Sequence, residues 1–114
     1  MVIRMIRRSH KYKNTPTVIG DRRFDSKAEA QRFIELSLLQ RVGQIADLEC
    51  QVRFPLVVNG IKVCAYVADF RYREVATGRL VIEDVKGVRT RDFVIKKKLM
   101  AAVHGIEVQE VSRS

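Results

Sequence analysis

Two turn signals constrain the fold of this chain most, because they divide residues 47–86 into three consecutive strands. Asn59-Gly60 lies between two apolar, strand-like runs and is typical of a two-residue hairpin turn. Val75-Ala76-Thr77-Gly78 marks the second turn. We therefore expect antiparallel strands over 47–58, 61–73 and 80–86, with Pro55 placing the first at a sheet edge or marking a bulge.

Helical patterns flank these strands. Ser26 as N-cap, with Glu29 three residues on, forms a capping box and predicts a helix that ends near Gly43. Thr90 as N-cap and Gly105 as terminator predict a second helix over 89–104, and alternation over 106–111 predicts a short last strand. The expected fold class is α/β (α+β), in the order αβββαβ, with a mixed sheet flanked by helices.

The register of the second hairpin brings two acids together. If Glu74 faces Arg79 as an opposite-charge pair, the pairing continues until Asp69 faces Asp84. Directly opposed side chains lie about 5 Å apart at Cβ, so two like charges there are destabilising. Either one carboxyl group is protonated or a cation lies between them, and a divalent oxygen-seeking ion such as Mg²⁺ fits. The alternative is a pair of solvated acids on a sheet edge.

Strand alternation places Lys86 on the face of Asp84 and Glu83 on the opposite face. Beside a metal and a phosphate, Lys86 would orient or help deprotonate a water and stabilise negative charge in the transition state. Alone, a lysine at a strand end is a solvated charge. On the first hairpin, a two-residue loop makes Gln51 face Ala68, away from the acid pair, unless Pro55 marks a bulge that reverses it.

Positive charge is concentrated in two blocks of this chain, which has a net charge of +9 and a pI of about 10.1. Residues 1–23 contribute +6 and residues 86–98 contribute +5. Nucleic acid is the expected partner of such a surface, and a basic protein without a polyanion partner is the alternative. The expected phosphate contacts, for which plain solubility is the competing role, are Arg7, Arg8, Lys11, Lys13, Arg89, Arg91, Lys96 and Lys97.

The remaining features of the sequence concern domain organisation, and they mainly exclude cysteine-based sites, membrane spans and a signal peptide. Residues 1–23 are expected to form a basic arm with a short strand over 17–19, and residues 24–114 a single domain. Cys50 and Cys64 lack metal or redox spacing and are expected to be buried free thiols. No apolar run approaches the roughly 18 residues of a membrane span, and the N-terminus is too charged for a signal peptide. A cytoplasmic location is expected.

The acids and lysine resemble a known nuclease signature. Asp69, followed on the next strand by Asp84-Val85-Lys86, is similar to the motif of the PD-(D/E)XK nuclease superfamily, although Ala68 stands where the motif often has Pro. Arg-Phe-Asp-Ser-Lys-Ala-Glu-Ala and Glu-Asp-Val-Lys-Gly resemble small phage-encoded, Holliday-junction-resolvase-like members. The resemblance covers about residues 11–111 and implies a restriction-endonuclease-like core.

This resemblance implies an activity and a set of ligands. Glu29, Asp69 and Asp84 would bind Mg²⁺ or Mn²⁺ with the Val85 carbonyl, and Lys86 would act on the attacking water. For Glu29, a purely structural role in the capping box is an equal alternative. The implied protein is a homodimeric endonuclease, a hydrolase that cleaves DNA, branched or junction DNA included, in the bacterial host cytoplasm if it is phage-encoded.

Two other functions remain open at the level of the sequence. A catalytically inactive DNA-binding accessory module of phage recombination or packaging would keep the same fold and charge. A basic structural protein would need no nucleic acid. The sequence leaves substrate structure, sequence preference, DNA versus RNA, and oligomeric state undetermined.

Overall fold

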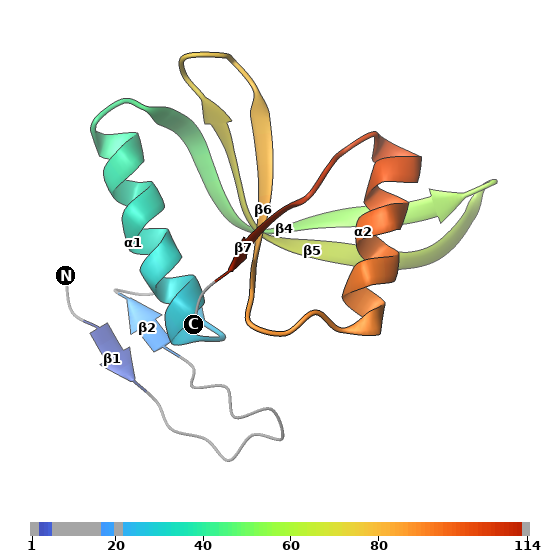
Figure 1. Ribbon diagram of the computed structural model, residues 1–114, viewed down its shortest axis with the longest axis horizontal. Helices are drawn as coiled ribbons and strands as arrows, with labels where there is room; N and C mark the ends of the chain where they lie inside the picture. The colour runs from blue at the N-terminus through green and yellow to red at the C-terminus, as the bar shows by residue number, and fades with distance from the viewer. Residues whose placement is uncertain (1–2, 6–16, 20–21, 113–114) are drawn as a thin grey trace.

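The described residues, 3–5, 17–19 and 22–112 of a computed structural model, form a mixed α+β fold. A four-stranded sheet has the order β4-β5-β6-β7, with β4 at Ile45–Val58, β5 at Ile61–Glu74, β6 at Leu80–Lys86 and β7 at Gln109–Ser112. The first three strands are antiparallel neighbours, and β7 runs parallel to β6. The predicted order of core elements and the mixed sheet are confirmed, with Pro55 on the edge strand β4 (Figure 1).

A small antiparallel sheet precedes the core, with β1 at Ile3–Met5, β2 at Thr17–Ile19 and β3 at Arg22–Phe24. The short strand expected over 17–19 is β2. Thr17, Ile19 and Phe24 are buried, and the last two pack in the hydrophobic core. The arm's candidate phosphate contacts Arg7, Arg8, Lys11 and Lys13 lie outside the described residues.

Both predicted helices are present with the predicted caps. In α1, Lys27–Arg41, Ser26 Oγ accepts from the Glu29 backbone N–H, and in α2, Arg91–His104, Thr90 Oγ1 accepts from the Phe93 backbone N–H. Gly105 ends α2 with a φ of 66°, a left-handed conformation that glycine adopts without a steric penalty. Neither of these helices is long and apolar enough to cross a membrane, and the described residues contain no other helix.

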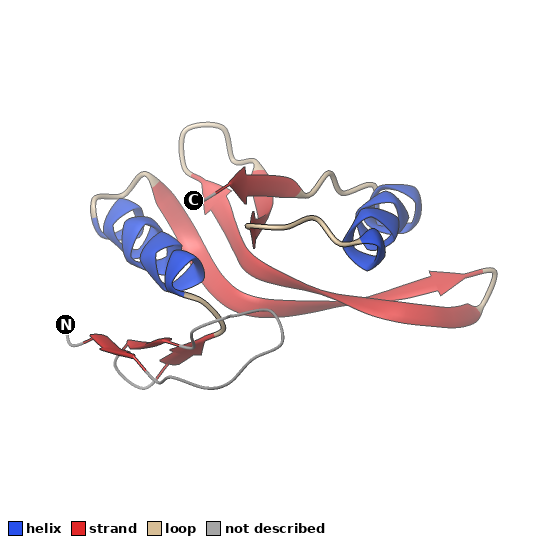
Figure 2. Cartoon of the chain, turned by 60° about the horizontal axis from the view of Figure 1, so that its bottom comes forward, coloured by secondary structure: helices blue, strands red, loops and turns tan. Residues whose placement is uncertain are grey.

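The long hairpin β4–β5 curves under both helices, so the core has two parts (Figure 2). The first, next to α1, contains Ile19, Phe24, Ala30, Leu36, Ile45, Phe70, Tyr72 and Val81. The second, next to α2, contains Leu56, Tyr66, Ala68, Ile82, Phe93, Met100 and Val108. Strand β6 lies between the helices in both views and contributes Val81 to one cluster and Ile82 to the other. Its following residues, Glu83 and Asp84, therefore enter different environments.

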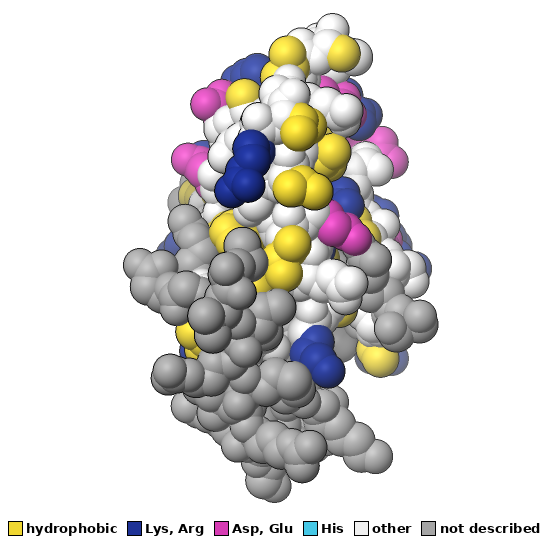
Figure 3. Space-filling model, turned by 90° about the vertical axis from the view of Figure 1, so that its left-hand side faces the viewer, with side chains coloured by type: hydrophobic (Ala, Val, Ile, Leu, Met, Phe, Trp, Pro, Cys, Tyr) yellow, Lys and Arg dark blue, Asp and Glu magenta, His cyan; other side chains and the backbone are white. Residues whose placement is uncertain are grey.

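Helix α1 packs against both sheets, but it does not bury all of its apolar side chains. Leu38 and Val42 are 58% and 64% exposed. Figure 3 shows hydrophobic side chains at the surface on the side of the molecule that carries α1, interspersed with Lys, Arg and acidic groups. Cys50 and Cys64 form no disulfide, as expected, but they are half-buried rather than buried, and each packs against one of the two core clusters.

The two hairpins differ in how well their registers follow from their turns. In the second, Glu74 faces Arg79 through a backbone hydrogen bond of 2.9 Å and an ion pair of 3.1 Å, and Arg71 faces Ile82 as predicted. In the first, Val57 faces Lys62 but Leu56 faces Cys64, so Val63 is an extra residue on β5. This bulge shifts the pairs from Leu56 to Glu49 by one residue, which changes the face of Gln51, and a second irregularity between Ala46 and Glu49 restores the register.

Candidate functional site

The centre of the site is the pair of acids at the end of the β5–β6 ladder. The last recorded pair is Phe70 with Glu83, so Asp69 and Asp84 occupy the next position along the two strands. The Asp69 carboxylate accepts a hydrogen bond of 2.8 Å from the Val85 backbone N–H, and it also interacts with the side chain of Asp84. Asp84 is only 3% exposed. The two acids are thus neighbours within the protein rather than solvated groups on a sheet edge.

Both oxygens of the Asp84 carboxylate have a partner. Lys86 Nζ lies 2.9 Å from Oδ1, and the Tyr66 hydroxyl donates to Oδ2. Burial, and then this hydrogen bond, raise the pKa of Tyr66 far above its ordinary value, so the hydroxyl remains a donor. The Lys86 ammonium also lies 4.3 Å from the centroid of the Phe93 ring. The shared face of Asp84 and Lys86 follows from strand alternation, whereas no pattern in the sequence identifies Tyr66.

Glu29 serves the helix start and the site at once. Its backbone N–H takes part in the cap at Ser26, but its side chain is 4% exposed and accepts a 2.6 Å hydrogen bond from Gln51 Nε2. A backbone N–H at Asp25 also donates to this carboxylate. Its negative charge raises the pKa of Asp69, which shows that the two groups interact electrostatically. Helix α1 therefore brings a third acid to the pair.

Gln51 corrects the sequence-based expectation. The interpretation without a bulge placed it opposite Ala68, but Ala68 faces Val52, and Gln51 falls between this pair and the pair of Cys50 with Phe70. Gln51 has a φ of 54°, an unusual value for a non-glycine residue within a strand. The extra residue that causes this change is Val63, and neither Val63 nor an adjacent residue is a glycine, which would have marked a bulge in the sequence. The open alternative of a bulge near Pro55 was the only signal for this residue.

Glu83 lies on the opposite face, as predicted, in a separate buried network. Arg32 of α1 binds its carboxylate through two hydrogen bonds, of 2.9 Å from Nε and 2.7 Å from Nη2. The Tyr72 hydroxyl donates to the same carboxylate, and Arg32 also pairs with Glu35 at 3.1 Å. This network fixes α1 to β6, and so sets the position of Glu29 relative to Asp84. Nothing in the sequence identified Arg32.

The electrostatics of the three acids show their mutual repulsion. Burial raises the pKa of Asp69 to about 8, and the negative charges of Glu29 and Asp84 add to this effect. Burial likewise raises the pKa of Glu29 to about 7, with further contributions from Asp25 and Asp84. Carboxyl groups with such pKa values are typical of functional sites. Either protons or a cation must compensate the charge at neutral pH.

The donor set fits a hard divalent cation, although the acids do not form a ready-made cage. No three His, Cys, Asp or Glu side chains of the described residues form a complete metal-binding group. Instead, Lys86, Tyr66, Gln51 and the Val85 N–H hold the carboxylate oxygens. The fold holds the three acids near one another, since they come from α1, β5 and β6, whereas the Lys86 ammonium lies on a flexible, partly exposed stem that can leave Asp84. Oxygen donors alone suit Mg²⁺ or Mn²⁺ rather than zinc.

The candidate phosphate contacts of the second basic block lie on and before α2. Arg91 is exposed at the start of the helix, and Lys96 is half-buried. Arg89 and Lys97 both bind Glu110 of β7, at 2.8 and 2.7 Å. Hydrogen bonding to Lys97, and then the charges of Lys97 and Arg89, lower the pKa of Glu110. Two of these candidate phosphate contacts, Arg89 and Lys97, are therefore already engaged in ion pairs within the protein.

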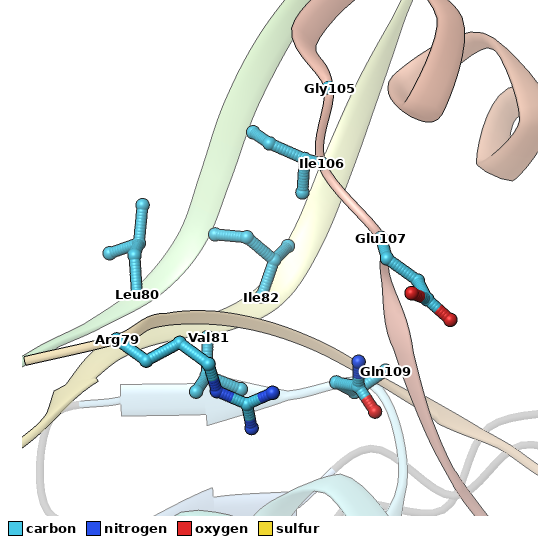
Figure 4. A pocket seen from close by; sticks show the side chains of 8 residues that line it. All are labelled: Arg79, Leu80, Val81, Ile82, Gly105, Ile106, Glu107 and Gln109. Carbon is cyan, nitrogen blue, oxygen red and sulfur yellow. The ribbon is translucent and has the colours of Figure 1, made fainter. Parts of the chain in front are cut away.

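A cavity of about 320 Å³ lies away from the acids, at the start of β6 (Figure 4). It is lined by Arg79, Leu80, Val81, Ile82, Gly105, Ile106, Glu107 and Gln109. Strand β7 begins at Gln109, later than predicted, and the preceding residues Ile106 and Val108 pack in the second core cluster without pairing with β6. The first residues of β6 therefore have no β7 partner. None of Glu29, Asp69, Asp84 and Lys86 lines this cavity.

Comparison with known proteins gives a family but no described function. A family model with the description "Protein of unknown function (DUF1064)" matches residues 9–113. No curated protein and no solved structure match the chain.

Proposed function

This chain belongs to the family described as protein of unknown function (DUF1064), and we propose that it is a Mg²⁺-dependent endonuclease of the PD-(D/E)XK class. Its substrate would be DNA phosphodiester bonds, including those of branched or junction DNA. One observation carries the proposal: Glu29 from α1, Asp69 from β5, and Asp84 and Lys86 from β6 meet where the β5–β6 ladder ends. Two basic segments supply the charge that a polyanionic substrate requires.

Each residue of the site has a distinct task in phosphodiester hydrolysis. Asp69, Asp84 and Glu29 would hold the ion, and a bound Mg²⁺ lowers the pKa of a coordinated water and neutralises phosphate charge. Lys86, 2.9 Å from Asp84, would orient the attacking water and stabilise negative charge developing on the phosphate. Tyr66 fixes the second oxygen of Asp84, and Gln51 fixes Glu29.

The contacts of Asp84 suggest how Lys86 would change partners when the site is occupied. Lys86 pairs with one Asp84 oxygen and Tyr66 donates to the other, so the charge of Lys86 would compete with that of a cation for this carboxylate. Lys86 is the mobile partner, since its side chain is 27% exposed and unbranched, whereas Tyr66 is buried. Release from Asp84 would free the ammonium for the water or the phosphate.

Cleavage of plasmid DNA and of a synthetic four-way junction tests the proposal. The wild type is incubated with each DNA and with a matching RNA duplex, in Mg²⁺, Mn²⁺ or EDTA, beside Asp84→Asn. Asp47→Asn is the matched control, because it makes the same chemical change at a side chain that is 77% exposed. We expect metal-dependent DNA cleavage by the wild type and the control, and loss of at least a hundredfold in Asp84→Asn.

Two results would contradict the proposal in different ways. DNA binding without cleavage in either metal would leave the inactive DNA-binding module as the function. Cleavage that survives Asp84→Asn would show that the reaction does not use this site.

We also propose that the active species is a homodimer. A chain of 114 residues with one acid cluster cuts one strand, so cleavage of two strands in one encounter needs two copies. Light scattering at micromolar concentration, with and without junction DNA, gives the mass directly. A monomeric mass in both conditions would contradict this proposal and leave the nuclease activity to be judged separately.

A further inference from the structure

Glu110 of β7 binds two cations that come from different places in the chain. Its Oε1 lies 2.8 Å from Arg89 Nε, in the β6–α2 connection, and its Oε2 lies 2.7 Å from Lys97 Nζ, on α2. The carboxylate is therefore shared between two ion pairs, with one oxygen for each. This arrangement holds both cations at fixed points on the surface next to β7.

These cations lie beside the candidate catalytic acids. In the parallel register of β6 and β7, Glu110 is the partner of Asp84, and side chains of directly paired residues point to the same face. The charge of Glu110 also contributes to the raised pKa of Tyr66, whose hydroxyl binds Asp84. A phosphate near Arg89 and Lys97 would thus be close to the phosphate at the acid site.

Space for an anionic group adjoins the two cations. A cavity of about 250 Å³ is lined by Arg89, Lys97 and Lys98, together with Val94, Ala101 and Glu107. Lys98 forms no ion pair with any described residue. Three cations line this small cavity, and the Glu110 carboxylate pairs with two of them.

We propose that Arg89, Lys97 and Lys98 form a phosphodiester-binding subsite, and that Glu110 is its built-in competitor. A backbone phosphate displaces the Glu110 carboxylate from Arg89 and Lys97, so the subsite favours a polyanion over an isolated anion. Glu110 thereby weakens binding to any single phosphate. This inference rests on the proposed DNA-directed function. It adds a place on the protein that would hold the DNA strand next to the cleaved bond.

Equilibrium binding of the full chain to fluorescent duplex and junction DNA in EDTA tests this inference. Dissociation constants are measured from 50 to 300 mM salt for the wild type, Glu110→Gln and Glu107→Gln. Glu107→Gln is the matched control, since it removes one negative charge from the cavity that Arg89 and Lys97 line, but Glu107 forms no ion pair within the described residues. Circular dichroism verifies that each variant is folded.

We expect Glu110→Gln to bind DNA roughly threefold to tenfold more tightly, because phosphate no longer competes with two ion pairs. Its salt dependence should steepen by about one in the slope of log K against log salt, since no counterion is taken up by a released carboxylate. Glu107→Gln should change the affinity less than twofold. Adding Arg89→Gln and Lys97→Gln to Glu110→Gln should remove the gain.

Equal effects of Glu110→Gln and Glu107→Gln would overturn the subsite and leave the nuclease proposal intact. Persistence of the gain after both cations are removed would overturn it too. If the wild type binds no DNA and Glu110→Gln does, the competitor role is supported. If neither binds DNA, both the subsite and the DNA-directed function are overturned. The plasmid assay decides the nuclease activity independently of these binding results.

Discussion

The buried acids make a specific prediction about stability and pH in the absence of metal. In the folded protein, the pKa of Glu29 is raised from 4.5 to about 7 and that of Asp69 from 3.8 to about 8, so both groups hold protons that the unfolded chain has lost. The free energy of unfolding must therefore fall as the pH rises through this interval. This sign is opposite to that of a carboxylate stabilised by an ion pair.

The size of the loss follows from these shifts. Each unit of pKa difference corresponds to about 1.4 kcal/mol, which gives about 3 kcal/mol for Glu29 and about 6 kcal/mol for Asp69. Their mutual repulsion is contained in both values, so the combined loss is smaller than the sum, and we expect about 5 kcal/mol between pH 4 and pH 8. Glu110, whose pKa is lowered, acts in the opposite direction only at the acidic end.

Urea unfolding in EDTA at pH 5, 6, 7 and 8 measures this loss, with far-UV circular dichroism as the signal because the chain has no Trp. Asp69→Asn keeps an acceptor for the Val85 N–H but cannot ionise. We expect its stability to match the wild type at pH 5, to exceed it by several kcal/mol at pH 8, and to decline only as Glu29 ionises. Asp47→Asn, at an exposed position, should follow the wild type.

A metal ion should reverse the loss in the wild type alone. Mg²⁺ at a hundred times its dissociation constant adds about 2.7 kcal/mol of stability. We expect this gain at pH 8 in the wild type and not in Asp69→Asn. A wild-type stability that is constant or rises from pH 5 to pH 8 would refute the argument that buried like charges dominate this site.

Three further predictions concern individual side chains. Lys86→Met should reduce the cleavage rate by about a hundredfold to ten-thousandfold, while DNA affinity changes little, because the ammonium acts on the reacting groups. Single-turnover kinetics separate the cleavage rate from the affinity, and an unchanged rate would exclude this role. Arg32→Leu should lower the free energy of unfolding in urea by about 3–5 kcal/mol, since it leaves Glu83 charged and buried. Adding Glu83→Leu should recover much of this loss, and a loss below about 1 kcal/mol in the single variant would contradict the buried network. Gln51→Gly should slow cleavage at saturating DNA, because Glu29 loses its hydrogen bond. Its stability should stay within about 1 kcal/mol of the wild type, because relief of the positive φ offsets this loss, and full activity would show that Glu29 needs no positioning.

Local signals in the sequence determined both helices, the strands β4, β5 and β6, and the register of one hairpin. The caps at Ser26, Thr90 and Gly105 act within a few residues, so the helix ends followed from residue type. The tight turn between Glu74 and Arg79 has an opposite-charge pair at its base, which set the register that leads to Asp69 and Asp84. Strand alternation separated Glu83 from Asp84 without any tertiary information.

Contacts between distant elements were decided only by the tertiary structure. A single extra residue, Val63, reversed the face of Gln51, and such a bulge depends on how the hairpin curves beneath two helices. The Glu29 carboxylate could satisfy the cap or the site, and the bidentate contact of Arg32 with Glu83 fixes the helix that carries it.

The contacts that Tyr66 and Glu110 make around Asp84 have the same origin. Tyr66 is eighteen residues away from Asp84 along the chain, and Glu110 reaches its position beside Asp84 only because β7 runs parallel to β6 after α2. The sequence by itself thus determined which acids and which lysine share a strand face, because alternation and turn geometry are local. The tertiary structure decided which groups hold those acids and charge the surface around them, because packing of the helices on a curved sheet is not encoded in any short segment.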